Sequence, residues 1–176
     1  MNYWDEKLKY SLGQQQEFDI ELLKQYIPDS VSVVKTNVEQ DKKGIDYVVT
    51  LNGGATINID AKTREPGCSK YWINKQPELA LEIWSVKEKK IIGWTLNTKT
   101  QVDYILYTFA REDCASFFLL PFQLLRKAFK QHGREWVNAY KSKLQKNKGY
   151  YSEAVFVPAN VVLQAVSDEM AHIIRR

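Results

Sequence analysis

The sequence predicts a single α/β domain over residues 1–176, with a mixed central β-sheet and flanking helices. Helical apolar spacing near both ends encloses several short runs rich in β-branched residues. The length suits one domain with a real core, and the composition, 44% hydrophobic and 26% charged, is that of an ordinary globular protein. No repeat or linker divides the chain, so we expect a core at about 5–120 and a helical and strand extension at 121–176.

The N-terminal part predicts a helix, a strand and a β-hairpin. Residues 5–27 carry apolar side chains at helical spacing, and Pro28 ends that helix. Residues 31–35 look like a strand because they are rich in valine. The hairpin consists of strands at 45–51 and 55–62 around the turn Asn52-Gly53-Gly54.

The rest of the chain alternates between strands and helices. An irregular segment at 63–77 follows the hairpin, and residues 87–90 form a turn. After Pro121 the apolar spacing fits a helix that Gly133 could break, and a last helix starts at about Asn160. Short apolar runs predict strands at 78–86, 102–109, 116–120 and 153–157.

The register of the hairpin decides which side chains meet. A three-residue loop puts Val49 opposite Ile57 and builds one continuous apolar face. A two-residue loop would set apolar residues against polar ones, so the three-residue loop is favoured. It places Asp46 directly opposite Asp60, with Lys62 next along on the same face. Directly opposed residues have Cβ atoms roughly 4.5–5.5 Å apart.

Two facing carboxylates repel each other, and a cation between them removes that penalty. One interpretation is therefore a metal site, in which two carboxylates and a lysine assist the cleavage of a phosphodiester. The other is a solvated polar face, on which Lys62 is the partner of both aspartates. Strand interiors are depleted in Asp, and two of them at one position favour the metal site.

The irregular segment after the hairpin mixes basic residues with aromatic rings. Such a segment suits contact with a nucleic acid, because rings stack on bases while cations meet phosphates. The structural alternative is that the two rings only cover the core. The candidate contacts are Arg64, Lys70, Tyr71, Trp72 and Lys75.

A second basic region lies in the C-terminal part. Residues 126–148 hold eight Lys or Arg against the single acid Glu135, a net charge of +7 in a chain whose overall charge is +4. Such a cluster is a plausible phosphate-binding surface, although charge runs are also common on solvated helix faces. Its candidate contacts are Lys127, Lys130 and Arg134.

The composition argues against several other classes. The two histidines, His132 and His172, have no neighbours at ligand spacing, so we expect neither a zinc site nor chemistry built on a histidine cluster. No apolar run reaches membrane-spanning length, and the polar N-terminus differs from a signal peptide. We therefore expect a cytoplasmic protein without membrane contacts.

Three motifs share one order along the chain. Glu17 closes Gly13-Gln-Gln-Gln-Glu17 on the first helix, Asp46 closes Gly44-Ile45-Asp46, and Asp60-Ala61-Lys62 lies on the next strand. Together they resemble the PD-(D/E)XK nuclease superfamily, which includes restriction endonucleases and archaeal-type Holliday junction resolvases. The family's proline is replaced here by Ile45.

The resemblance implies a restriction endonuclease-like core in the order αβββαβ and a Mg²⁺-dependent endodeoxyribonuclease, with Mn²⁺ as a substitute. Asp46, Asp60 and the carbonyl of Ala61 would hold the metal, with Glu17 acting through water or on a second ion. Lys62 would orient the attacking water and stabilise charge on the phosphorus oxygens. DNA is the expected partner, and RNA stays open. A homodimer is expected because symmetric cleavage of two strands calls for two copies of the site.

Two other classes stay open. A nucleic-acid-binding protein, such as a phage or mobile-element regulator, could keep the fold without catalysis and bind through the basic helix. An interaction module could use the acidic cluster to bind a basic partner. The joint presence of Glu17, Asp46, Asp60 and Lys62 favours the nuclease.

Overall fold

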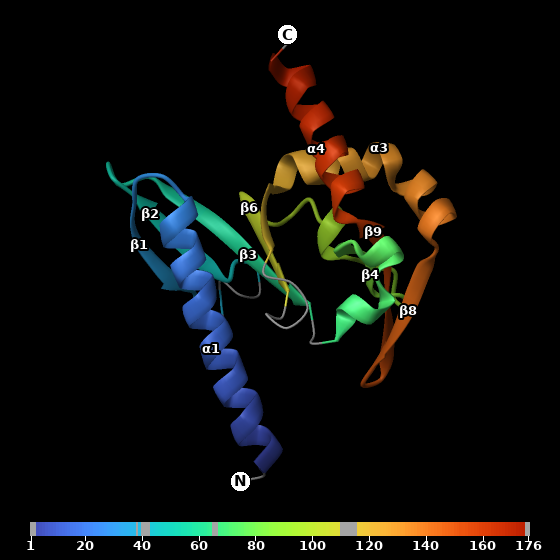
Figure 1. Cartoon of the computed structure of the whole chain (residues 1–176), viewed down its shortest axis with the longest axis horizontal. Helices are drawn as coiled ribbons and strands as arrows, with labels where there is room; N and C mark the ends of the chain where they lie inside the picture. The colour runs from blue at the N-terminus through green and yellow to red at the C-terminus, as the bar shows by residue number, and fades with distance from the viewer. Residues whose placement is uncertain (1–2, 38, 40–42, 65–66, 110–115, 175–176) are drawn as a thin grey trace.

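The computed structural model places a long N-terminal helix, α1 (Tyr3–Tyr26), beside a five-stranded sheet (Figure 1). It describes residues 3–37, 39, 43–64, 67–109 and 116–174, with side chains from residue 15 onward apart from 172 and 174. The strand order is β1-β2-β3-β6-β7, and within this sheet β3 and β6 are the parallel pair. The strands are β1 (Ser30–Lys35), β2 (Tyr47–Leu51), β3 (Thr56–Arg64), β6 (Tyr104–Phe109) and β7 (Phe117–Pro121).

Helix α1 covers one face of this sheet. Leu23 of the helix and Ile27, directly after its end, pack with Tyr47, Val49 and Ile59 in one buried cluster. Because side chains alternate along a strand, the odd-numbered residues of β3 face α1 and its even-numbered residues lie on the opposite face. Asp60 and Lys62 therefore point away from α1.

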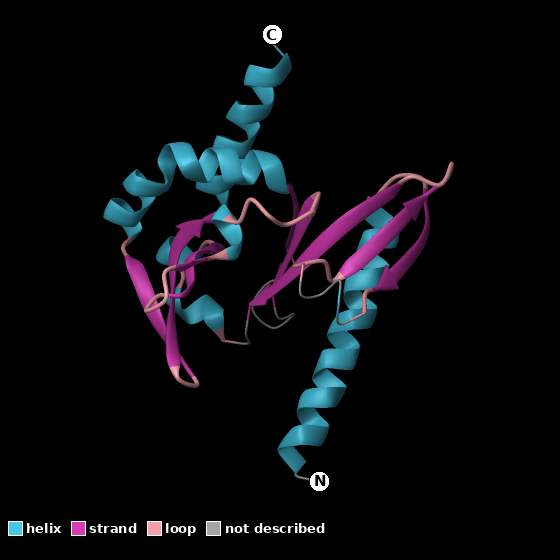
Figure 2. Ribbon diagram, turned by 180° about the vertical axis from the view of Figure 1, so that it is seen from behind, coloured by secondary structure: helices cyan, strands magenta, loops and turns pink. Residues whose placement is uncertain are grey.

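A second sheet, antiparallel and four-stranded, lies beside the first (Figure 2). The predicted mixed sheet is present, but the sequence did not predict that some of its expected strands form a sheet of their own. Alternating apolar residues, such as Leu79 and Leu81, indicate a strand without naming its partner. In the order β5-β4-β9-β8, the strands are β4 (Glu78–Val86), β5 (Ile91–Ile92), β9 (Tyr150–Pro158) and β8 (Ser142–Asn147).

Two helices, α3 (Phe122–Tyr140) and α4 (Ala159–Ile174), pack on each other and on the second sheet. Helix α3 runs unbroken through Gly133, so the expected break was wrong. A Cβ atom there would lie 3.1 Å from the ring of Phe129, and glycine leaves room for that ring. None of the described helices has the length and apolar character needed to cross a membrane.

One large buried cluster joins the two sheets and both C-terminal helices. It includes Leu81 of β4, Ile105 of β6, Leu125 of α3 and Val162 of α4. Strand β9, from the region expected to be an extension, pairs with β4 from the region expected to be the core. Both regions therefore belong to a single domain.

The connection from β3 to β6 differs from the αβββαβ order. Its described residues, 67–103, form β4, β5 and three short 3₁₀ helices, with no α-helix among them. The 3₁₀ helices are η1 (Cys68–Tyr71), η2 (Ile73–Lys75) and η3 (Trp94–Leu96).

The hairpin has the predicted register. Val49 pairs with Ile57, and Tyr47 pairs with Ile59. The amide of Leu51 donates to the carbonyl of Ala55 at 2.8 Å, which closes the expected three-residue loop. The loop residues Gly53 and Gly54 have φ values of 107° and 87°, a backbone region that favours glycine.

Candidate active site

The first residue of the site, Asp46, lies just before β2. The strand pairs end at Tyr47 and Ile59, and the amide of Asp46 donates to the carbonyl of Ile59 at 2.8 Å. Extending the register by one residue would place Asp46 directly opposite Asp60. The structure does not continue the pairing to Asp46, so the two residues are not directly opposed. The Oδ2 atom of Asp46 instead accepts a hydrogen bond from the amide of Ala61 at 2.7 Å. This bond satisfies a β3 donor at the point where β2 no longer supplies a carbonyl.

Asp60 is the buried member of the pair, with 5% of its surface exposed. Its Oδ1 accepts a hydrogen bond from the ammonium group of Lys62, two residues along the same face of β3. Burial raises the pKa of Asp60 to about 7, although Lys62 opposes the rise. Asp46 raises the pKa of Asp60 further, so the two carboxyl groups are close enough for one to affect the charge of the other.

Lys62 is the more exposed partner of this ion pair, with 31% of its side chain accessible. Its ammonium lies 5.8 Å from the centre of the Trp94 ring. The amide of Trp94 donates to a carboxylate oxygen of Glu82 at 3.1 Å, which anchors η3 to β4. A Cβ atom on Gly93 would lie 2.4 Å from the carbonyl oxygen of Glu82, so this close approach requires glycine. Trp94 thus forms a wall of the site beside Lys62.

The predicted helix acid, Glu17, is exposed on α1 and is not brought to the pair. The acid that α1 places inside is Asp19, with 3% of its surface exposed. Burial raises the pKa of Asp19, and the charge on Asp46 raises it further. The helix therefore does carry an acid near Asp46, two residues after the predicted one.

Asp19 is held by a small polar network between α1 and the sheet. Its carboxylate accepts from the hydroxyl of Tyr47 at 3.1 Å and from the side-chain amide of Gln15 at 2.8 Å. The same amide group also donates to the hydroxyl of Thr108 at 3.2 Å, and Thr108 lies 2.9 Å from the hydroxyl of Thr63. The signal in the sequence was the spacing Gln15, Asp19, Leu23, which puts three residues on the face of the helix that packs on the sheet.

The donor atoms around the pair suit a hard divalent cation. The carboxyl group of Asp46 lies at the amide of Ala61, next to Asp60 in the chain. The carbonyl of Ala61 faces the same side, because a strand residue directs its N–H and C=O to the same neighbour. Oxygen donors of this kind, with water completing the shell, are what Mg²⁺ prefers. The part of the chain with described side chains contains no group of three or more His, Cys, Asp or Glu residues arranged to hold a metal. Any ion here would therefore depend on two carboxylates and the backbone.

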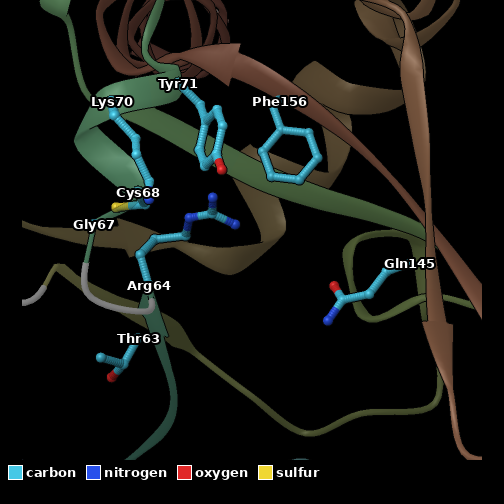
Figure 3. A pocket seen from close by; sticks show the side chains of 8 residues that line it. All are labelled: Thr63, Arg64, Gly67, Cys68, Lys70, Tyr71, Gln145 and Phe156. Atoms are coloured by element: carbon cyan, nitrogen blue, oxygen red, sulfur yellow. The ribbon is translucent and has the colours of Figure 1, made fainter.

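The basic and aromatic residues after β3 fall into separate environments. Arg64, Lys70 and Tyr71 line a cavity of about 550 Å³ (Figure 3). Trp72 instead covers the core, with its ring edge-on to Phe109 at a centroid distance of 5.4 Å. Lys75 is exposed on η2.

The residues Lys127, Lys130 and Arg134 lie exposed along one side of α3. Helix α3 packs against α4, β9 and η3. These three cations therefore form a surface on the helical layer, carried by different elements from those that hold Asp60 and Lys62.

No family model, no curated protein and no solved structure matches this chain.

Proposed function

We propose that this chain is a metal-dependent endonuclease that hydrolyses phosphodiester bonds in DNA, with Mg²⁺ as its ion and Mn²⁺ as a substitute. The observation that carries the proposal is that Asp46, held on the amide of Ala61, lies beside the buried Asp60, which is paired with the ammonium of Lys62. The pKa of Asp60 near 7 supports it: burial raises this pKa, and the nearby carboxyl group of Asp46 raises it further.

The arrangement of elements supports a restriction endonuclease-like core. Helix α1 is followed by β1, β2 and β3 in one sheet, and β6 lies parallel beside β3. The proposed catalytic strand is thus central in its sheet, which gives its side chains a rigid base.

Each residue has a proposed task. Asp46 and Asp60 would hold the ion with the carbonyl of Ala61, and Asp19 would take the place expected of Glu17 by adding negative charge that attracts the ion. Bound there, a divalent ion supplies Lewis acidity and lowers the pKa of the attacking water. Once Asp60 is engaged, the ammonium of Lys62 would be released to position that water and to stabilise charge on the phosphorus oxygens.

The test incubates plasmid, single-stranded and branched DNA with Mg²⁺ or Mn²⁺, and an RNA substrate decides the open alternative. We expect Asp60→Asn and Lys62→Ala to lose activity by about 10²- to 10³-fold, the scale seen when one group that stabilises the transition state is removed. The exposed residues Asp168 and Lys89 supply matched controls, Asp168→Asn and Lys89→Ala. Equal activity in wild type and in both site variants would refute the assignment.

The second candidate is a nucleic-acid-binding protein without catalysis, and the ion pair between Asp60 and Lys62 favours it. In that case the lysine would serve as the permanent partner of the buried aspartate. This candidate predicts that the wild type binds DNA, cuts nothing with either ion, and loses stability rather than activity in Lys62→Ala.

We further propose a homodimer, because two copies of the site are needed to cut both strands of a duplex symmetrically. Sedimentation of the protein with and without a duplex measures the subunit number. A chain that stays monomeric in both conditions would restrict the activity to one strand at a time.

A further inference from the structure

The cavity beyond Lys62 lies between the two sheets. Its walls include Arg64 at the end of β3, Lys70 and Tyr71 on η1, and Phe156 on β9 (Figure 3). Its volume of about 550 Å³ falls in the range of sites that hold small organic molecules. It is too small for a base pair with its two backbones, but it suits one nucleotide.

The charge of the cavity wall is positive. Two of its eight lining residues are the cations Arg64 and Lys70, and none of the eight is an acid. A third cation, Lys143, lies over the ring of Phe156 at 5.0 Å from its centre. A cavity of this composition attracts an anion rather than a neutral or cationic ligand.

Arg64 is held in place but keeps a donor unused. Its guanidinium lies over the ring of Phe156, 4.8 Å from the centre, and interacts with the hydroxyl of Tyr107. Its Nε is buried and has no hydrogen-bond partner among the described residues. A buried donor without an acceptor is unfavourable, and a shift of the Arg64 side chain toward the cavity would let an anionic oxygen there accept from it.

Tyr71 supplies a ring that a base could cover. It is 66% exposed, which is unusual for a large aromatic side chain. Figure 3 shows its ring near that of Phe156, with the side chain of Arg64 extending toward both. Exposed rings beside cations are how proteins bind unpaired bases, because a base can stack on a ring only after leaving its own stack.

The position of the cavity links it to the proposed active site. Asp60, Lys62 and Arg64 alternate along the same face of β3, so Arg64 lies about 6.6 Å beyond Lys62 along the strand. That separation is comparable to one nucleotide step of an extended strand. A phosphate at Arg64 would thus neighbour one at Lys62.

We propose that this cavity binds one unpaired nucleotide of the substrate strand, with its phosphate at Arg64 and Lys70 and its base on Tyr71. The inference rests on the proposed nuclease function, because that function makes the bound strand a substrate. It narrows the substrate class to single strands, or to duplexes with an unpaired nucleotide beside the cut.

Binding is measured in EDTA, so that it does not depend on cleavage. The probe is a fluorescein-labelled oligothymidylate of eight nucleotides, compared with a blunt duplex of the same length and with inorganic phosphate and thymidine monophosphate as competitors. We expect the single strand to bind more tightly than the duplex. Thymidine monophosphate should compete better than inorganic phosphate, because its base also stacks on the ring of Tyr71.

Tyr71→Ala should weaken binding of the single strand by about 5- to 150-fold, the scale of one base stacked on one ring. Tyr71→Phe keeps the ring and should restore most of the affinity. Lys70→Ala should weaken both competitors, whereas Tyr150→Ala, an exposed tyrosine on β9, should change nothing. Both Tyr71 and Lys70 are exposed, so these variants should fold, and circular dichroism checks that they do.

Wild-type affinity in both Tyr71→Ala and Lys70→Ala would overturn the inference, and so would a duplex that binds as tightly as the single strand. Competition by inorganic phosphate alone would show an anion site without a base and would also overturn it. If Tyr71→Ala and Lys70→Ala bind weakly while Asp60→Asn cuts normally, the nucleotide-binding cavity is supported and the proposed catalytic site is refuted. If the two variants bind normally while Asp60→Asn loses cleavage, the catalytic site is supported and the nucleotide-binding role of the cavity is refuted.

Discussion

The carboxylate of Asp46 accepts a hydrogen bond from the amide of Ala61 at 2.7 Å, although Asp46 itself has left the strand pairing. The bond keeps the carboxyl group beside Asp60 after the backbone has turned away. One side chain thus completes the hydrogen bonding of β3 and supplies a candidate metal ligand. These two tasks can be separated by mutation.

We expect Asp46→Ala to lower the free energy of unfolding by about 1–3 kcal/mol, because the amide of Ala61 loses its acceptor. Asp46→Asn keeps an oxygen for that amide and should change stability little, yet it removes the charge that the ion requires. Urea denaturation and cleavage assays on the two variants measure the two tasks. An Asn variant with full cleavage would remove Asp46 from the catalytic set.

The second prediction concerns pH and Asp60. The folded pKa is near 7 and the unfolded value near 3.9, so between these values the folded chain holds a proton that the unfolded chain has released. The free energy of unfolding should therefore fall as the pH rises from about 4 to 7 and level off above that range. At 1.36 kcal/mol per pKa unit, the ceiling of this fall is about 4 kcal/mol.

The measurement is urea denaturation in EDTA at several pH values, for wild type and for Asp60→Asn. Other carboxyl groups, among them Asp19, contribute in both proteins, so the difference between the two curves isolates Asp60. Curves of equal slope over this range would contradict the prediction.

The third prediction concerns the ion. In the proposed site protons and Mg²⁺ would compete for Asp60, so Mg²⁺ should raise the Tm at pH 8 and have little effect at pH 5. At ten times the Kd the stabilisation is about 1.4 kcal/mol. Asp60→Asn should abolish the shift, and removal of the ion with EDTA should reverse it. A shift of the same size at both pH values would indicate binding elsewhere on the chain.

The fourth prediction compares the two acids of α1. Asp19→Ala leaves the hydroxyl of Tyr47 and the amide of Gln15 without their acceptor in a buried setting, and we expect a loss of about 1–3 kcal/mol. Glu17→Ala changes an exposed side chain and should stay within about 0.5 kcal/mol. Thermal unfolding measures both variants. Equal effects would contradict the placement of Asp19 as the inner acid.

Much of the first sheet could be predicted because its signals are local. The turn at Asn52-Gly53-Gly54 and the alternation around Val49 and Ile57 decide the hairpin register without any other part of the chain. The same information predicted which face of β3 carries Asp60 and Lys62. The same local signals did not predict that Asp46 lies outside the strand pairing. Where a strand leaves its partner depends on the chain segment that precedes it.

The sequence predicted Glu17 rather than Asp19 as the helix acid near the site, because both residues have apolar neighbours at helical spacing. Glu17 lies three residues before Ile20, and Asp19 lies four before Leu23, so both are next to apolar positions. The sheet decides between them, since Tyr47 offers its hydroxyl to Asp19 alone. Strand β8 was missed for a different reason. Its residues, Ser142–Asn147, are mostly exposed and polar, and pairing with β9 holds them in place.

The pairing of β4 with β9 has a consequence for folding during synthesis on the ribosome. Trp94 stands beside Lys62 because Glu82 anchors it to β4, and β4 needs β9 on its other edge. Strand β9 ends almost a hundred residues after Lys62, which a ribosome adds in roughly 5–20 s. During that interval β3 can pair with β2, but the wall beside Lys62 has not assembled. A nascent chain would therefore expose Asp46 and Asp60 well before the wall of the proposed active site is complete.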